Sequence, residues 1–245
     1  MATNKSPSKR PHSRVEPLNQ PEDVLPGLSI DNVIFGLDHG QLKILLVKHK
    51  VGPGKGHWAL PGGFIHREEN LRDAAARLLE ELTGMRDLFL EQLKSFGRVD
   101  RFPNERVVTI AYYALISAED YTVVAGHNTT EAVWFDAQDL PDLIYDHSEI
   151  VDHGLHFLRH KVCHEPIGFN LLPEKFTLLQ LQELYEAILD VKLDKPNFRR
   201  KMMKMNLLAP CNEKQKGVPH RAANLYRFDS AAYERLTEKG FSFEF

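Results

Sequence analysis

The sequence contains little cysteine and no long hydrophobic run. Only two cysteines stand among 245 residues, Cys163 and Cys211, and they are far apart. Such a pair is not a disulfide framework and fits a reducing cytoplasm better. No apolar stretch approaches the roughly 20 residues that cross a bilayer, and residues 1–14 lack the apolar segment of a secretory signal. These absences exclude a membrane protein and a secreted disulfide scaffold, and we expect a cytoplasmic location.

A large excess of either charge is also missing, but the charges are unevenly distributed. The formal net charge is −3. Residues 1–16 carry four basic groups against one acidic group, and residues 195–227 carry nine Lys and Arg against Glu213 alone. An acidic body with basic segments at both ends favours a polyanion such as DNA as partner. Runs of charge are more often simply solvated surface, so this asymmetry does not by itself establish DNA binding.

The length of 245 residues predicts two domains. Residues 1–26 contain five prolines and almost no large apolar side chains, which predicts a flexible basic arm. We expect a first domain over residues 27–163, a linker over 164–173 and a second domain over 174–245.

Apolar periodicity and turn residues predict the elements of the first domain. The expected elements are strands over 29–37, 42–48, 96–99, 107–116 and 132–135, a turn at 38–40, a helix over 71–82 stopped by Gly84, and a helix capped by Asp146 that reaches about His160. In the second domain, Thr177 and Gln180 have the spacing of a capping box, and a further helix starts near Asp194 with Pro196 in its first turn. A basic stretch and a strand over 225–228 follow, which is the order of a winged helix-turn-helix.

Residues 63–85 carry a spaced pattern of glycines and charged residues. Gly63 is followed after five residues by Glu69 and after seven more by Arg77, and the pattern ends in Glu81, Gly84 and Met85. This pattern resembles the Nudix box. The resemblance implies a Nudix α/β/α sandwich with a mixed sheet, so that the fold class is α/β (α+β) with a C-terminal winged helix-turn-helix domain.

Two positions of the box depart from the family. Leu78 and Leu82 stand where Nudix enzymes have glutamates, and they extend an apolar stripe that begins with Leu71 and Ala75. Mg²⁺ prefers several oxygen ligands, and Glu81 alone should hold it poorly. The sequence therefore predicts no catalytic residues, no metal and no enzyme activity.

The phosphate-binding part of the box is retained. Residues 97–103 (GRVDRFP) resemble a stretch of ADP-ribose-directed Nudix proteins, which implies ADP-ribose as effector, with no cofactor. Arginines can pair with phosphates or stack on adenine. The predicted effector-binding residues are Trp58, Gly62, Gly63, Arg77, Glu81, Arg98, Arg101 and Phe102. The arginines and Trp58 also have a purely structural interpretation. Arg98 and Arg101 would then be surface charges, Arg77 an ion-pair partner of Glu69, and Trp58 a core residue.

The helix that starts near Lys195 has two unlike faces. Phe198, Met202 and Met205 fall on one side and should pack inward, whereas cationic and amide side chains fall on the other. Arg pairs with guanine, Asn with adenine, and lysines neutralise phosphates, so this helix suits the major groove of double-stranded DNA. The predicted DNA-binding residues are Lys195, Asn197, Arg199, Arg200, Lys201 and Lys204 on the helix, and Lys214, Lys216, His220 and Arg221 in a wing.

The second domain and its fusion to a degenerate Nudix domain together resemble the Nudix-related transcriptional regulators of NAD metabolism, the NrtR family. The segments 194–201 (DKPNFRRK) and 224–228 (NLYRF) carry this resemblance. It implies a homodimeric repressor of genes of NAD biosynthesis or salvage that leaves operator DNA when ADP-ribose binds. Residues 218–221 (VPHR) depart from the expected glycine-arginine-proline run of the wing. The alternative functions are a Nudix hydrolase of ADP-ribose with a C-terminal dimerisation domain, and a pure interaction module.

Overall fold

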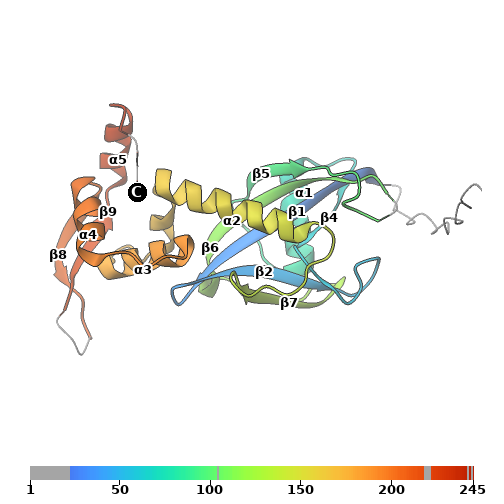
Figure 1. Ribbon diagram of the computed structural model, residues 1–245, viewed down its shortest axis with the longest axis horizontal. Coiled ribbons are helices and arrows are strands. Elements are labelled where there is room, and N and C mark those ends of the chain that lie inside the picture. Colours follow the sequence, from blue (N-terminus) through green and yellow to red (C-terminus); the bar gives the residue numbers. More distant parts are fainter. Residues whose placement is uncertain (1–22, 104, 218–221, 242, 244) are drawn as a thin grey trace, which may run out of the picture.

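The computed structural model describes residues 23–103, 105–217, 222–241, 243 and 245, which form two lobes (Figure 1). Most of the predicted arm, and the predicted wing residues His220 and Arg221, lie outside the described residues. The part of the arm that is described is not free: β1 begins at Val24, which is buried and pairs with His66. Strand β1 therefore begins three residues before the predicted domain boundary at residue 27.

The first lobe is built on a seven-stranded sheet formed by β1 (Val24–Asp38), β2 (Gln41–His49), β3 (Trp58–Ala59), β4 (Gly62–His66), β5 (Glu91–Phe96), β6 (Val108–Ser117) and β7 (Thr129–Asp136). The central strand β1 is antiparallel to β2 and β4 and parallel to β6. β5 continues the sheet beyond β6, and β3 and β7 both pair with β2. The strand predicted over 96–99 is wrong, because β5 ends at Phe96.

Two helices cover opposite faces of this sheet. Ile30 and Ile34 of β1 belong to one apolar cluster with α1 (Leu71–Thr83), and Val33 and Phe35 belong to another with α2 (His147–His164). Successive side chains of a strand point to opposite faces, so β1 supplies both clusters. The result is the α/β/α sandwich that the sequence predicted.

Helix α1 follows the predicted stripe except at its first residue. Ala75, Leu78 and Leu82 are buried, whereas Leu71 is 38% exposed. The helix ends at Gly84, whose φ of 73° is readily adopted by glycine. The two leucines that replace glutamates are therefore part of the core.

Helix α2 is longer than predicted and runs from the sheet to the second lobe (Figure 1). It continues to His164, and the residues expected to form a linker include a 3₁₀ turn, η2 (Ile167–Leu171), with Phe169 buried. Asp146 precedes the helix, but its carboxylate makes no capping hydrogen bond to the described backbone. The predicted cap is wrong because this carboxylate has another partner.

The second lobe contains α3 (Leu178–Leu189), α4 (Lys195–Lys204), β8 (Leu208–Lys214), β9 (Asn224–Phe228) and α5 (Ser230–Thr237). The predicted capping box forms: Gln180 N–H donates to Thr177 Oγ1 and Thr177 N–H donates to Gln180 Oε1. Tyr185, Phe198 and Met202 are buried beneath α3 and α4. Two helices followed by a β8–β9 hairpin are the predicted winged helix. β8 and α5 were not predicted.

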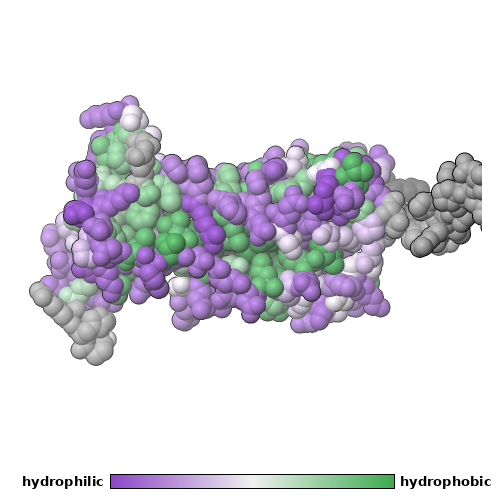
Figure 2. Space-filling model, in the orientation of Figure 1, coloured by the Kyte–Doolittle hydropathy of each residue, from purple (hydrophilic) through white to green (hydrophobic). Residues whose placement is uncertain are grey.

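The two lobes meet along α2 and α3, and α3 also contacts β2. A groove of about 560 Å³ remains between the β1–β2 turn and the second half of α3. Hydrophilic residues cover most of the visible surface, and hydrophobic ones gather in separate patches (Figure 2). In the part of the chain that the structure describes, no helix is both long and apolar enough to pass through a membrane.

Candidate functional site

A cavity of about 150 Å³ opens beside the glycines of the box. Its walls come from β1, from the segments on either side of β3, from β4, from residues 101–107 and from the start of α2. The residues that form it are Ser29, Asp31, His49, Val51, Pro53, Gly54, Leu60, Gly62, Gly63, Phe64, Arg101, Phe102, Val107, Tyr145 and His147. Four predicted effector-binding residues, Gly62, Gly63, Arg101 and Phe102, are therefore brought together.

Arg101 is the principal buried cation of this cavity. Its side chain is 3% exposed. It donates from Nε to Asp146 Oδ2 and from an amino nitrogen to Asp146 Oδ1, both at 2.8 Å, and to Asp31 Oδ2 at 3.2 Å. Burial alone lowers the pKa of Arg101, but the two carboxylates outweigh burial and raise it. Arg101 is thus a fixed positive charge held between β1 and the start of α2.

His147 is the first residue of α2 and lies against the same carboxylates. Its Nδ1 accepts a hydrogen bond from Leu60 N–H at 3.0 Å, and its Nε2 lies 3.5 Å from Asp31 Oδ1. Burial lowers the pKa of His147, which favours the neutral ring. With Nδ1 accepting, the neutral ring carries its proton on Nε2, facing Asp31.

Aromatic rings line another side of the cavity. Phe102 and Tyr145 have ring centroids 4.8 Å apart, and Phe64 contacts Phe102 edge to face at 6.3 Å. Burial raises the pKa of Tyr145 and keeps the phenol neutral. These rings offer a flat apolar surface of the kind on which a nucleobase stacks.

The glycines of the box are required by close contacts. A Cβ on Gly62 would lie 2.5 Å from the carbonyl oxygen of Ile30, and a Cβ on Gly63 would lie 2.7 Å from Leu78 Cδ2. Leu78 therefore fills the space beside the loop. A glutamate at this position in Nudix enzymes would present its carboxylate here.

The other predicted effector-binding residues do not line this cavity. Trp58 packs edge to face on Phe135 at 4.8 Å, and Arg98 is exposed and pairs with Asp100 and Glu149. Arg77 and Glu81 lie on α1 and bond to each other at 3.1 Å. The interpretation of Trp58 as a packing residue and of Arg98 as surface charge fits these positions better.

Arg77 ties the box loop to α1. It donates to both oxygens of Glu69, at 2.9 and 2.6 Å, and to the carbonyl of Phe64 at 3.1 Å. Glu69 also accepts from His66 N–H. The hydrogen bond from Arg77 holds the pKa of Glu69 below its usual value. This is the ion-pair interpretation of Arg77 that the sequence allowed.

Sequence reasoning missed five titratable residues of this site: Asp31, His49, Tyr145, Asp146 and His147. One signal was present, because Asp31 is a charged residue within a predicted strand that also contains Ile30, Val33 and Ile34. Among the described residues, the group with a geometry that could hold a metal ion is Asp38, His39 and Glu119. It lies at the β1–β2 turn, away from α1, and Lys43 already pairs with Asp38.

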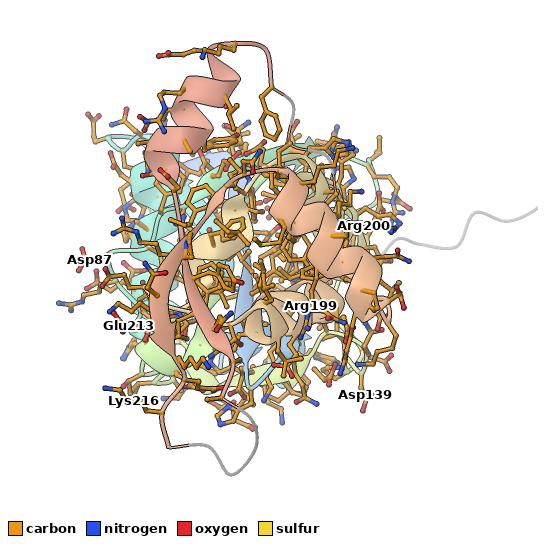
Figure 3. All side chains as sticks on the ribbon, turned by 90° about the vertical axis from the view of Figure 1, so that its left-hand side faces the viewer. Asp87, Asp139, Arg199, Arg200, Glu213 and Lys216 are labelled. Carbon is orange, nitrogen blue, oxygen red and sulfur yellow. The ribbon has the colours of Figure 1, made fainter. Side chains whose placement is uncertain are left out.

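The winged helix presents a cationic surface at the end of the molecule (Figure 3). Asp194 caps α4 by accepting from Asn197 N–H at 3.0 Å, and Phe198 and Met202 are buried. The remaining face is exposed, and all the predicted helix residues lie on it: Lys195, Asn197, Arg199, Arg200, Lys201 and Lys204.

The wing continues this surface. Lys214 and Lys216 are exposed at the end of the β8–β9 hairpin, and Figure 3 shows the hairpin and α4 on the same end of the molecule. Glu213, the acid of this segment, is paired with Lys175 at 2.7 Å. Its charge is thereby offset, and the surface stays positive. Fold and sites together define a Nudix domain that carries a DNA-binding winged helix, as found in transcriptional regulators.

Two family models match this chain: "NUDIX domain" over residues 27–154 and "NrtR DNA-binding winged helix domain" over residues 168–228. A curated relative from Acinetobacter baylyi, the "ADPR responsive transcriptional repressor NtrR", is 36% identical over 212 residues, which are 85% of this chain and 84% of the relative. The chain belongs to this NrtR family of transcriptional repressors.

Two solved structures support the same assignment. Shewanella oneidensis NrtR complexed with a 27mer DNA is 28% identical with a TM-score of 0.67, covering 88% of this chain and 97% of that one. The NUDIX domain of the same organism's NrtR, complexed with ADP ribose, is 29% identical with a TM-score of 0.50, covering 60% of this chain and 95% of that one.

Proposed function

We propose that this protein represses transcription by binding operator DNA through α4 and the β8–β9 wing, and that ADP-ribose in the cavity beside the box releases it. One observation carries the proposal. The same chain combines an exposed cationic helix with a box whose metal-ligand positions are filled by buried leucines. The first feature suits DNA, and the second suits a domain that binds a nucleotide without cleaving it.

The DNA-binding mode follows from the exposed face of α4. Asn197 and Arg200 lie one turn apart and bond to each other, so both face the same groove and can contact base edges. The flanking Lys195, Arg199, Lys201 and Lys204, with Lys214 and Lys216 of the wing, neutralise phosphates. A homodimer places two such helices on half-sites about one helical turn, roughly 34 Å, apart.

The effector-binding mode follows from the cavity. Arg101 supplies a positive charge for a phosphate, and Phe102 with Tyr145 supplies a surface for adenine. The cavity of about 150 Å³ is smaller than ordinary ligand pockets, whose volumes begin at about 300 Å³. ADP-ribose therefore needs the walls to separate when it enters.

The box supports binding rather than hydrolysis. Leu78 and Leu82 are each 6% exposed, and Glu69 and Glu81 both bond to Arg77. We expect negligible Mg²⁺-dependent turnover of ADP-ribose, no cofactor, a cytoplasmic location, and target genes in NAD biosynthesis or salvage. The alternative of an ADP-ribose pyrophosphatase would need metal ligands that these leucines do not supply.

The test is a fluorescence anisotropy titration on the promoter beside the protein's own gene, with and without ADP-ribose. We expect specific binding that ADP-ribose weakens at least fivefold. A parallel assay measures the formation of AMP and ribose 5-phosphate from ADP-ribose with Mg²⁺. Turnover within tenfold of an ordinary Nudix enzyme, or DNA binding indifferent to ADP-ribose, would refute the proposal.

A further inference from the structure

One helix touches both sites. His147, the first residue of α2, lines the cavity, and Asp146, the residue before it, contacts the cavity residue Arg101. The last turns of the same helix contact the second lobe: Arg159 donates to the carbonyl of Ile188 at 3.2 Å, and the carbonyl of Cys163 accepts from Phe245 N–H at 2.8 Å. Any displacement of the start of α2 therefore reaches the DNA-binding lobe through a continuous helix.

The guanidinium of Arg101 holds the start of α2 in place, and the same group is the one that a ligand phosphate would bind. Asp146 has a side chain that is 1% exposed, and its described partner is Arg101, which binds both of its oxygens. A diphosphate is the stronger competitor for a guanidinium, because it offers more charge and more acceptor oxygens. Once Arg101 turns to phosphate, Asp146 is left as a buried charge that has lost its ion pair, which is unfavourable unless the carboxylate moves.

The helix has a second fixed point near its other end. Lys161 contacts Glu91 Oε1 of β5 at 2.6 Å and Tyr113 at 3.0 Å. Asp146 and Lys161 are about 22 Å apart along a helix that rises 1.5 Å per residue, so a 2 Å shift at the start tilts α2 by about 5°. The groove between the β1–β2 turn and α3 gives the second lobe room to follow.

Resting on the proposed function and deepening it, we propose that the Arg101–Asp146 ion pair positions α2 for DNA binding and that an effector phosphate breaks it by taking Arg101. Arg101 contacts the ligand. Asp146 acts through α2 and is a positioning residue. The winged helix is thus oriented for DNA binding only while the Arg101–Asp146 ion pair is intact and the cavity holds no effector.

The decisive variant is Asp146→Asn, which keeps the size of the side chain and removes its charge. We expect DNA affinity to fall at least fivefold, because α2 loses its anchor. ADP-ribose affinity should rise several-fold, because Arg101 no longer has a competing carboxylate. Substitution of a residue that merely supports the fold would weaken both affinities. A fall in DNA affinity together with a rise in ADP-ribose affinity therefore distinguishes the positioning role.

Glu149→Gln is the matched control. Glu149 lies one turn further along α2, is exposed and pairs only loosely with Arg98, at 3.4 Å. It undergoes the same carboxylate-to-amide change without touching the cavity, and both affinities should stay at the wild-type values. If Asp146→Asn behaves like Glu149→Gln, or loses both affinities while its circular dichroism spectrum shows that it is folded, the positioning role is refuted.

Hydrogen exchange on the wild-type protein decides the case in which Asp146→Asn fails to fold. Saturating ADP-ribose should reduce protection of the first amides of α2, whose Ile150 N–H donates to Asp146 O at 3.1 Å. Unchanged or increased protection would overturn the proposal. Wild-type protein that neither binds the promoter nor responds to ADP-ribose would instead refute the proposed function itself, so the two failures are distinguishable.

Discussion

Replacing Leu78 and Leu82 by glutamate restores the residue types of an active Nudix box, and we expect it to destabilise the protein without creating an efficient enzyme. Both side chains are 6% exposed and belong to the apolar clusters under the sheet. Leu78 also packs against the box loop at Gly63. The substitution therefore introduces two carboxylates into a space shaped for leucine.

The magnitude follows from burial. Each buried leucine contributes about 1.5–3 kcal/mol to the free energy of unfolding, so the double variant loses about 3–6 kcal/mol before any cost of burying charge. Whole domains are stable by about 5–15 kcal/mol. In a protein of this size, Tm falls by about 2–4 °C for each kcal/mol of lost stability. The Tm of the double variant should therefore be at least about 6 °C below that of the wild type.

The assay is thermal unfolding followed by circular dichroism, with Leu71→Glu as control. Leu71 is on the same helix but is 38% exposed, and it stands in the first turn, where a negative charge is favourable. Its variant should melt within about 2 °C of wild type. A double variant that melts with the wild type, or that hydrolyses ADP-ribose efficiently with Mg²⁺, would refute the assignment of these positions to the core.

Three further outcomes follow from the second lobe. Arg200→Ala should weaken operator binding by about 1–3 kcal/mol, roughly 5–150-fold, while calorimetry shows unchanged ADP-ribose affinity in DNA-free solution; loss of both would mean that the sites overlap or that the fold is damaged. The backbone N–H of Leu193 lowers the pKa of Glu186 to about 2, so Glu186 stabilises the fold above its ordinary pKa and this contribution is lost as pH falls toward 2. Glu186→Gln should therefore lose less stability than wild type between pH 7 and pH 3, and parallel melting curves would contradict this. Phe245 packs on Tyr185 and Phe198, so Phe245→Ala should cost about 1–2 kcal/mol of stability and weaken DNA binding, whereas unaltered binding would show that α4 does not depend on it.

Local sequence patterns predicted those elements whose structure is determined by interactions between residues close in sequence. The box spacing placed α1 and its glycine end within one residue, because helix periodicity and a C-terminal glycine act over a few positions. The alternation of α4 between apolar and cationic residues predicted both its buried and its exposed face. Strand β5 was misplaced because its sequence, EQLKSF, is mostly polar and only Phe96 is buried, so it carries little apolar signal.

The cavity could be predicted only in part. Gly62, Gly63, Arg101 and Phe102 came from a motif, whereas the partner of Arg101 lies 45 positions away. An aspartate before a helix is usually a cap, and nothing near Asp146 indicates that tertiary folding brings a guanidinium to it. Long-range ion pairs of this kind depend on topology and leave no local pattern.

The parallel pairing of β1 with β6 also constrains how the chain reaches this fold. Leu28 pairs with Val108, 80 positions later, and the register continues to Leu37 and Ser117. Contacts that close such long loops form slowly. During synthesis, β1 must wait with one edge unpaired until β6 has been made, and its apolar side chains are then exposed to self-association. When the full-length chain refolds, the winged helix, which is built from near neighbours in sequence, has no comparable delay, so the lobe that binds DNA can form before the sheet of the first lobe is complete.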